Sequence, residues 1–166
     1  MGKVIEKLRL TNVFDPKRTV EVEAVIDTGA TMLVLPRSLV RKLKLRKMRE
    51  AGVRYADSRT ATKPVYGVVT AELKGRGGEF DVLAEDDGCQ ALVGQIVLEQ
   101  LDLIVDPKKR RVVPNPQSPD LPMVEILALT RGRIGAKVDR GERLARGRRE
   151  DKNPGSVPSN PDYESG

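Results

Sequence analysis

One short segment of the sequence places an acid in a setting suited to chemistry. In residues 25–31, VIDTGAT, Asp27 directly follows an apolar run and directly precedes Thr28 and Gly29. Gly29 permits a sharp turn that brings a backbone N–H to the carboxylate, and Thr28 carries a hydroxyl able to hydrogen-bond across an interface. The small side chain of Ala30 leaves the surroundings open. The segment fits a carboxylate held in a partly dry site, although Asp-Thr-Gly is also ordinary turn chemistry.

The composition removes most other catalytic chemistries. The 166 residues include no histidine and one cysteine, Cys89. Ser-His-Asp and Cys-His catalysis are therefore excluded, and a zinc site is not expected. We expect no metal and no cofactor. A lone cysteine cannot form an intrachain disulfide and fits a reducing compartment, and Cys89 is interpreted as a small, partly buried residue and not as a nucleophile.

The charge balance raises the question of acidic partners. The net charge is +6 and the pI is near 9.6, which is weak evidence for nucleic acid. The densest basic run, RKLKLRKMR at 41–49, is predicted to form the solvated face of a helix. It lacks the aromatic residues that accompany charge in nucleic-acid sites, so we expect no nucleic-acid partner. No signal peptide and no apolar run of about 20 residues is found, so we expect a cytoplasmic protein that makes no membrane contact.

The elements that must position Asp27 are predicted to be strands. Residues 20–26 alternate between apolar and polar side chains with a period of two, which is the clearest strand pattern in the chain. Residues 4–11 show a looser form of the same pattern, and Asp15-Pro16-Lys17 is predicted to be the turn between them. The two strands form a predicted hairpin that leads into Asp27.

The rest of the first two thirds alternates between short strands and turns. The predicted elements are a buried strand at 32–35, a helix at 36–45, a hairpin with arms at 53–56 and 65–73 and a polar tip at 57–63, strands at 79–84 and 91–94, a helix at 96–101, and strands at 103–105 and 111–113. This pattern predicts a mainly β fold, a closed barrel or sandwich of short antiparallel strands with one or two short helices.

The composition changes along the chain and divides it into three parts. Residues 1–116 are predicted to form the folded domain. Residues 117–130 form a Pro-rich linker with one more candidate strand at 123–130, MVEILALT. Residues 131–166 are basic and poor in apolar side chains, so this tail is expected to be disordered.

Two motifs together resemble those of the retropepsin-like aspartic proteases. The first is DTGAT, followed by MLVL, Pro36 and a helix; the second is ALVG at 91–94, followed by a helix and a strand. The resemblance extends from residue 4 to about residue 114. It implies hydrolysis of peptide bonds in a peptide or protein substrate by two aspartates, one from each copy of the Asp-Thr-Gly loop. This chain has one copy, since Asp57-Ser58-Arg59 lacks the glycine, so the resemblance implies a symmetric homodimer that pairs Asp27 with its counterpart.

The same resemblance assigns expected roles to the residues of the first motif. Asp27 would provide one carboxylate of the catalytic pair, Thr28 would bond across the dimer interface, and Gly29 would hydrogen-bond Asp27. The hairpin at 53–66 would correspond to the flap that closes over an extended substrate.

The resemblance also implies a set of substrate-binding residues. Ala30, Thr31 and Met32 would lie near the bound peptide. Leu92 and Val93 would form the wall of an apolar pocket, although a role in the core explains these two equally well.

Two other functions compete with an endopeptidase. The chain could keep the fold as a catalytically silent dimerisation or peptide-binding module. A phosphate-binding ATPase fragment is the third class, because actin-like folds also use an acidic loop with Gly and Thr after a strand. That fold needs two large subdomains, for which 166 residues are too few.

Overall fold

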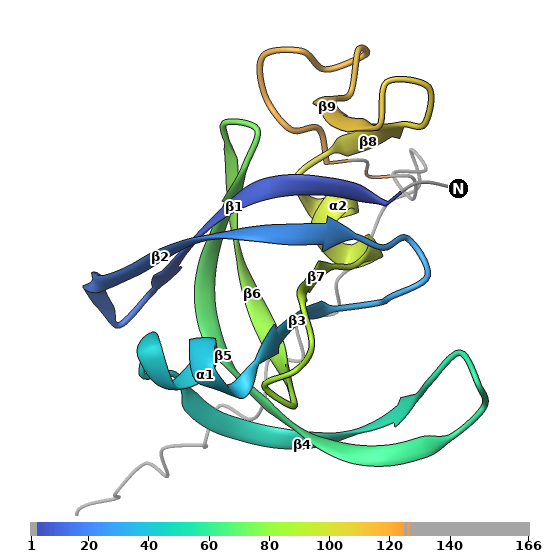
Figure 1. Ribbon diagram of the computed structural model, residues 1–166. Coiled ribbons are helices and arrows are strands. Elements are labelled where there is room, and N and C mark those ends of the chain that lie inside the picture. The colour runs from blue at the N-terminus through green and yellow to red at the C-terminus, as the bar shows by residue number, and fades with distance from the viewer. Residues whose placement is uncertain (1–2, 125, 127–166) are drawn as a thin grey trace, which may run out of the picture. The chain divides into compact units, whose positions relative to one another are not determined.

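The computed structural model describes residues 3–124 and 126, which lie in a compact unit at 1–126 (Figure 1). The tail predicted at 131–166 and most of the candidate strand at 123–130 lie outside the described residues. Met123 and Val124, at the start of that strand, are not in a strand. The elements are β1 Val4–Asn12, β2 Asp15–Ile26, β3 Leu33–Pro36, α1 Arg37–Lys42, β4 Arg46–Arg54, β5 Thr60–Leu73, β6 Arg76–Glu85, β7 Ala91–Val93, α2 Gln95–Gln100, β8 Leu103–Asp106 and β9 Arg111–Pro114.

The main sheet closes on itself. Its strand order is β1-β2-β7-β3-β6-β5-β4, and β1 also pairs with β5 through a register that runs from Arg9↔Glu72 to Asn12↔Val69. Because this pairing joins two distant members of the sheet, six of its strands form a closed barrel in the order β1-β2-β7-β3-β6-β5. Within this sheet, only β4 lies outside the barrel. The prediction of a mainly β fold with one or two short helices is confirmed, and the described part of the chain has two.

The barrel interior is filled by branched aliphatic side chains. Along β1 and β2 the buried residues follow the predicted alternation, so that Leu8, Leu10 and Val20 face inward and the glutamates of β2 face solvent. Leu8, Leu10, Val69, Val82 and Val93 are each 0% exposed. The core therefore needs almost no aromatic side chains, as the composition indicated.

Two of the pairings differ from the predicted all-antiparallel arrangement. β2 pairs with β7 in parallel, with Ile26 opposite Val93, and β3 pairs with β6 in parallel, with Val34 opposite Leu83. β5 and β2 are also longer than predicted, with 14 and 12 residues. Parallel partners are far apart in sequence, so local alternation contains no information about them.

The basic run at 41–49 does not lie on a single helix, so that prediction was wrong. α1 ends at Lys42, and residues 46–49 belong to β4. Pro36, the predicted helix start, is the N-cap of α1. The first hairpin turn lies at Val13 and Phe14 and not at residues 15–17.

A polar cluster holds the segment that follows β9. The guanidinium of Arg76, only 6% exposed, donates to the carbonyl oxygens of Leu101 at 3.0 Å and Asp102 at 2.5 Å, and also to that of Ser118. The Asp102 carboxylate accepts hydrogen bonds from the Ser118 hydroxyl, from Asn115 Nδ2 at 2.8 Å and from the backbone N–H of Met123 at 3.0 Å. A buried guanidinium needs such partners, and the cluster extends the folded contacts past Pro116.

The hydrogen bonds that Asp102 accepts predict a pH dependence of stability. The Ser118 hydroxyl, then Asn115 and the Met123 N–H, lower the pKa of Asp102 from its ordinary value of 3.8 to about 2. A lowered pKa in the folded state stabilises the protein above the unfolded pKa, and this stabilisation is lost as the pH falls through about 2. Asp102→Asn keeps a side chain that tolerates the positive φ of 50°. We expect the difference in Tm between wild type and this variant to be largest above pH 4 and to shrink towards pH 2, measured by thermal unfolding. Parallel profiles across that range would contradict this role.

Candidate active site

Asp27 stands at the end of β2, where the strand leaves the barrel. Its backbone N–H donates to the carbonyl oxygen of Val93 at 3.0 Å, so the β2–β7 ladder continues up to the acid itself. Its side chain is exposed, as is that of Thr28. The buried strand therefore fixes the backbone, while the carboxylate is exposed to solvent.

A tight turn orients the carboxylate. The Gly29 N–H donates to Asp27 Oδ1 at 2.9 Å, which confirms the predicted bond, and the Ala30 N–H donates to the Asp27 carbonyl oxygen at 3.1 Å. A Cβ on residue 29 would lie 3.2 Å from Asp27 Oδ1. Glycine therefore allows the N–H to approach without crowding the acid.

The loop at 27–32 is bound to the start of α2. The Gln95 N–H donates to the carbonyl oxygen of Ala30 at 2.8 Å, and the Ile96 N–H donates to that of Thr31 at 3.1 Å. The first N–H groups of a helix have no partner within the helix, and here the loop supplies the acceptors. Two segments more than 60 residues apart in the sequence are thereby held together.

Gly94 makes this contact possible. A Cβ at position 94 would lie 2.4 Å from the Met32 carbonyl oxygen and 2.7 Å from the Ala30 carbonyl oxygen. Both contacts are with backbone atoms, which cannot move away as a flexible side chain can. Gly94, the last residue of the predicted ALVG motif, is a site-forming residue that the sequence analysis did not assign to the site.

An apolar cluster lies beside this loop, separate from the barrel core. Val34, Val65 and Leu83 form its buried centre, and four half-buried side chains pack against it: Met32, Ala51, Val53 and Leu92. Met32 comes from the Asp27 loop, and Ala51 and Val53 come from β4. The cluster therefore joins the loop to the β4–β5 hairpin, the segment predicted to be the flap.

All but one of the predicted site residues lie in the Asp27 loop or in the apolar cluster beside it. Asp27, Thr28, Gly29 and Thr31 are exposed, and the structure brings Met32 and Leu92 together in the apolar cluster next to them, with Ala30 half-buried in the loop. Val93 is 0% exposed in the barrel core. The prediction that Val93 lines a substrate pocket therefore has to be corrected, because neighbouring residues of a strand point to opposite faces.

Sequence reasoning missed Ala51 and Leu83 as neighbours of the site. The signal was present for Ala51, because Ala51, Val53 and Tyr55 occupy every second position in EAGVRY. The predicted hairpin arm began only at Val53, whereas β4 begins at Arg46.

Two other reactive groups, Cys89 and Asp57, are less suited to catalysis than Asp27. Burial, then the nearby carboxylates of Glu85 and Asp86, raises the pKa of the Cys89 thiol, which disfavours the nucleophilic thiolate. Asp57 lies in the hairpin tip and binds Arg59 at 2.6 Å. Among residues 3–124 and 126, no cluster of acidic or cysteine side chains could hold a metal ion, and no helix in that part of the chain has the length and apolarity to cross a membrane.

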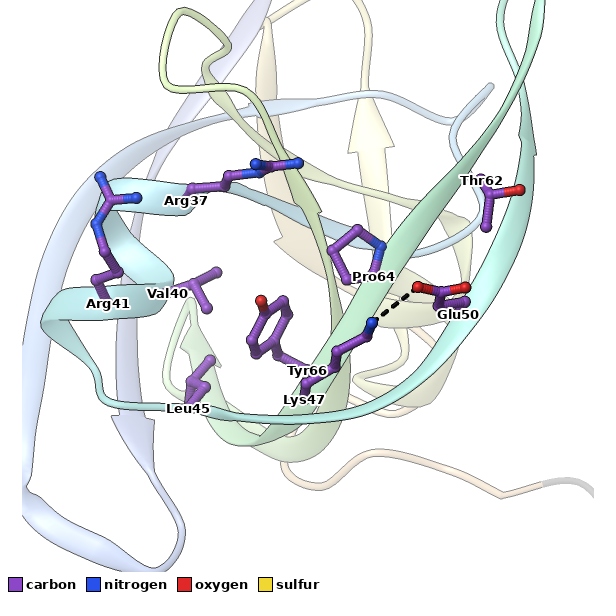
Figure 2. A pocket seen from close by; sticks show the side chains of 9 residues that line it. All are labelled: Arg37, Val40, Arg41, Leu45, Lys47, Glu50, Thr62, Pro64 and Tyr66. Atoms are coloured by element: carbon purple, nitrogen blue, oxygen red, sulfur yellow. Dashed lines mark hydrogen bonds and ion pairs between the residues drawn. The ribbon is translucent and has the colours of Figure 1, made fainter.

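A hollow of about 540 Å³ lies between α1 and the base of the β4–β5 hairpin, and Asp27 does not line it (Figure 2). Its lining includes Val40 and Arg41 from α1, Glu50 from β4, and Pro64 and Tyr66 from β5. The close view also marks the ion pair between Lys47 and Glu50, two lining residues of β4 whose charged atoms are 2.8 Å apart. We assign no catalytic role to this hollow because it contains no part of the Asp27 loop.

The close approach at Gly94 predicts a large effect of one methyl group. We expect Gly94→Ala to lower the free energy of unfolding by about 2 kcal/mol or more, because the loop backbone must shift. Urea denaturation measures the effect. Gly52→Ala is the matched control, because a Cβ at position 52 meets no atom within 4 Å. Equal stability of the two variants would contradict the proposed contact.

Comparison with known proteins places these features in a family. The profile of a family described as aspartyl protease matches residues 12–107. A search of curated proteins gave no match. Among solved structures, EIAV protease complexed with the inhibitor HBY-793 is similar, with 20% identity and a TM-score of 0.45 over 60% of this chain and 88% of that chain. The profile match covers more than half of the sequence and includes both the Asp27 loop and the Gly94 contact, so the chain belongs to the aspartyl protease family.

Proposed function

We propose that the protein is an aspartic endopeptidase that acts as a homodimer, with Asp27 of each chain forming the catalytic pair. The observation that carries this proposal is the exposed carboxylate of Asp27, which is oriented by the Gly29 N–H in a chain of the aspartyl protease family. The described residues contain one such Asp-Thr-Gly loop. A pair of these acids therefore requires two chains, related by a two-fold axis.

The chemistry follows from placing two carboxylates close together. Two such groups a few ångströms apart cannot both ionise and instead share one proton. The ionised member takes a proton from a water held between the two acids, and the protonated member donates to the oxygen of the scissile carbonyl. Water attacks the carbonyl carbon directly. The reaction needs no histidine, no metal and no covalent intermediate.

The surroundings of the loop suit an extended peptide. The apolar cluster beside Asp27 offers half-buried Met32 and Leu92 to a substrate side chain, and the β4–β5 hairpin contributes Ala51 and Val53 to the same cluster. A hairpin that packs over the acid can exclude water from the reacting bond. The exposed Thr28 is free to bond to its counterpart in the partner chain.

The activity is tested by replacing the acid while keeping its hydrogen bond. Asp27→Asn retains an oxygen that accepts from the Gly29 N–H, so we expect the fold and the Tm to persist while peptide cleavage falls at least 1000-fold, of the order seen when a catalytic group is lost. Cleavage of a peptide library by the purified full chain, between about pH 3 and pH 8, provides the measurement. Specific activity of the wild type should rise with protein concentration through the dimer Kd.

The matched control is Asp106→Asn. Asp106 also ends a strand and accepts from two backbone N–H groups, those of Lys108 and Lys109 at 3.0 Å each. This variant should cleave at the wild-type rate. Absence of cleavage by a wild-type dimer at every pH would leave the silent binding module as the function of this fold, and a monomer that cleaves would overturn the pairing.

A further inference from the structure

The β4–β5 hairpin is joined to the barrel over only part of its length. The β5–β6 ladder begins at Val65↔Leu83 and Tyr66↔Val82, and it shifts register between Tyr66 and Val69. Residues 60–64 of β5 pair only with β4. The outer portion of the hairpin, residues 49–64, therefore projects from the sheet and needs other contacts to hold its position (Figure 1).

One face of this projecting portion bears Ala51 and Val53 of the apolar cluster, and its other face borders a hollow. There Glu50, Thr62 and Pro64 line the hollow of about 540 Å³ (Figure 2). Space therefore separates this side of the hairpin from α1. The apolar cluster and the side-chain hydrogen bonds from the hairpin to the barrel lie on the other face.

On that face, both arms of the hairpin bind one carboxylate of the barrel. Tyr55, next after β4, donates its hydroxyl to Glu85 Oε1 at 2.5 Å, and Lys63 of β5 donates to Glu85 Oε2 at 2.8 Å. Glu85 is the last residue of β6 and lies opposite Pro36, at the end of β3. The two contacts occur just beyond the point where the β5–β6 ladder stops.

The electrostatics of this cluster are those of a partly buried charge pair. The side chains of Lys63 and Glu85 are 14% and 15% exposed. Burial opposes ionisation of Glu85, but the hydrogen bonds from Lys63 and Tyr55 outweigh it and lower the pKa of the carboxyl. The hydrogen bond to Glu85 raises the pKa of Lys63 in turn. Asp86, 3.6 Å from Lys63, adds a second anion at the exposed side.

We infer that Tyr55, Lys63 and Glu85 form a latch that fixes the hairpin over the apolar cluster before substrate binds, and that Glu85 is a positioning residue for the proposed reaction. All three groups belong to one chain, and both oxygens of Glu85 are occupied by the hairpin. The latch therefore orders the hairpin in the free protein. A substrate then meets a preformed cover and does not have to order it, which favours binding.

Only the predicted effect of the latch on catalysis rests on the proposed function. Hydrogen exchange tests the latch itself independently of any activity. Glu85→Gln in the full chain keeps the shape of the side chain but removes the charge that Lys63 needs. We expect backbone amides at 53–62 to exchange about tenfold faster or more, since charge-assisted hydrogen bonds are roughly twice as strong as neutral ones. Tyr55→Phe removes only one hydroxyl and should give a smaller increase. The increase in exchange rate caused by the double variant, Lys63→Met with Glu85→Gln, should be smaller than the sum of the increases caused by the two single variants. The effects are not additive because the two groups act together.

Glu72→Gln is the matched control, because Glu72 also lies in a strand and pairs with Arg9 at 3.6 Å, but its side chain is 50% exposed. It should leave exchange at 53–62 unchanged. With a peptide that the wild type cleaves, Glu85→Gln should raise KM about tenfold and change kcat less than twofold. If the amides at 53–62 exchange at the wild-type rate in Glu85→Gln, the latch is overturned, whatever the activity. If Glu85→Gln does not fold, the same result in Tyr55→Phe overturns it. Faster exchange in a protein without peptidase activity would uphold the latch and count only against the proposed function.

Discussion

The contact between Gly94 and the loop at 27–32 is the constraint on which the site depends. Asp27 is exposed, so its own side chain gains little from packing, and the loop that carries it must be held by its backbone. The carbonyl oxygens of Ala30 and Thr31 accept from the first turn of α2, and this is possible only where residue 94 has no side chain. Two short motifs far apart in sequence are thus a single structural unit, which explains why they occur together in the chain.

The two faces of the sheet at β3 and β7 pack into two different apolar clusters. At the paired positions Val34 and Leu92, side chains point into the small apolar cluster, while their neighbours Leu35 and Val93 point into the barrel core at 0% exposed. A one-residue difference in the sequence therefore separates Leu92, which is half-buried in the apolar cluster, from Val93, which is fully buried in the barrel core. On the cluster face Val34, Val65 and Leu83 are buried, and the side chains packed around them are half-buried.

The sequence predicted the parts of this fold that depend on local patterns. Alternation located β1 and β2, the apolar run located β3, and Pro36 marked the start of α1. The turn at Asp27, in which the Gly29 N–H donates to the carboxylate, was also predicted, because a glycine there lets a backbone N–H approach the acid closely. Barrel closure through β1 and β5, the parallel pairs and the extent of β4 depend on contacts between distant segments, and periodicity does not record these. The Arg76–Asp102 cluster was missed for the same reason, since Arg76 reads as an ordinary charged turn residue until its carbonyl partners are in place.

The charged residues of this chain show why burial, and not charge alone, indicates importance. Most of the ion pairs between described residues involve exposed side chains, such as Arg18–Asp15 and Arg59–Asp57, and pairs of that kind contribute little to stability. Arg76 with Asp102 and Lys63 with Glu85 are the pairs with both side chains at most 15% exposed. The first fixes the segment after β9, and the second joins the projecting hairpin to the barrel. Each lies where a backbone ladder has ended, so a charge pair supplies the connection that hydrogen-bonded strands no longer provide.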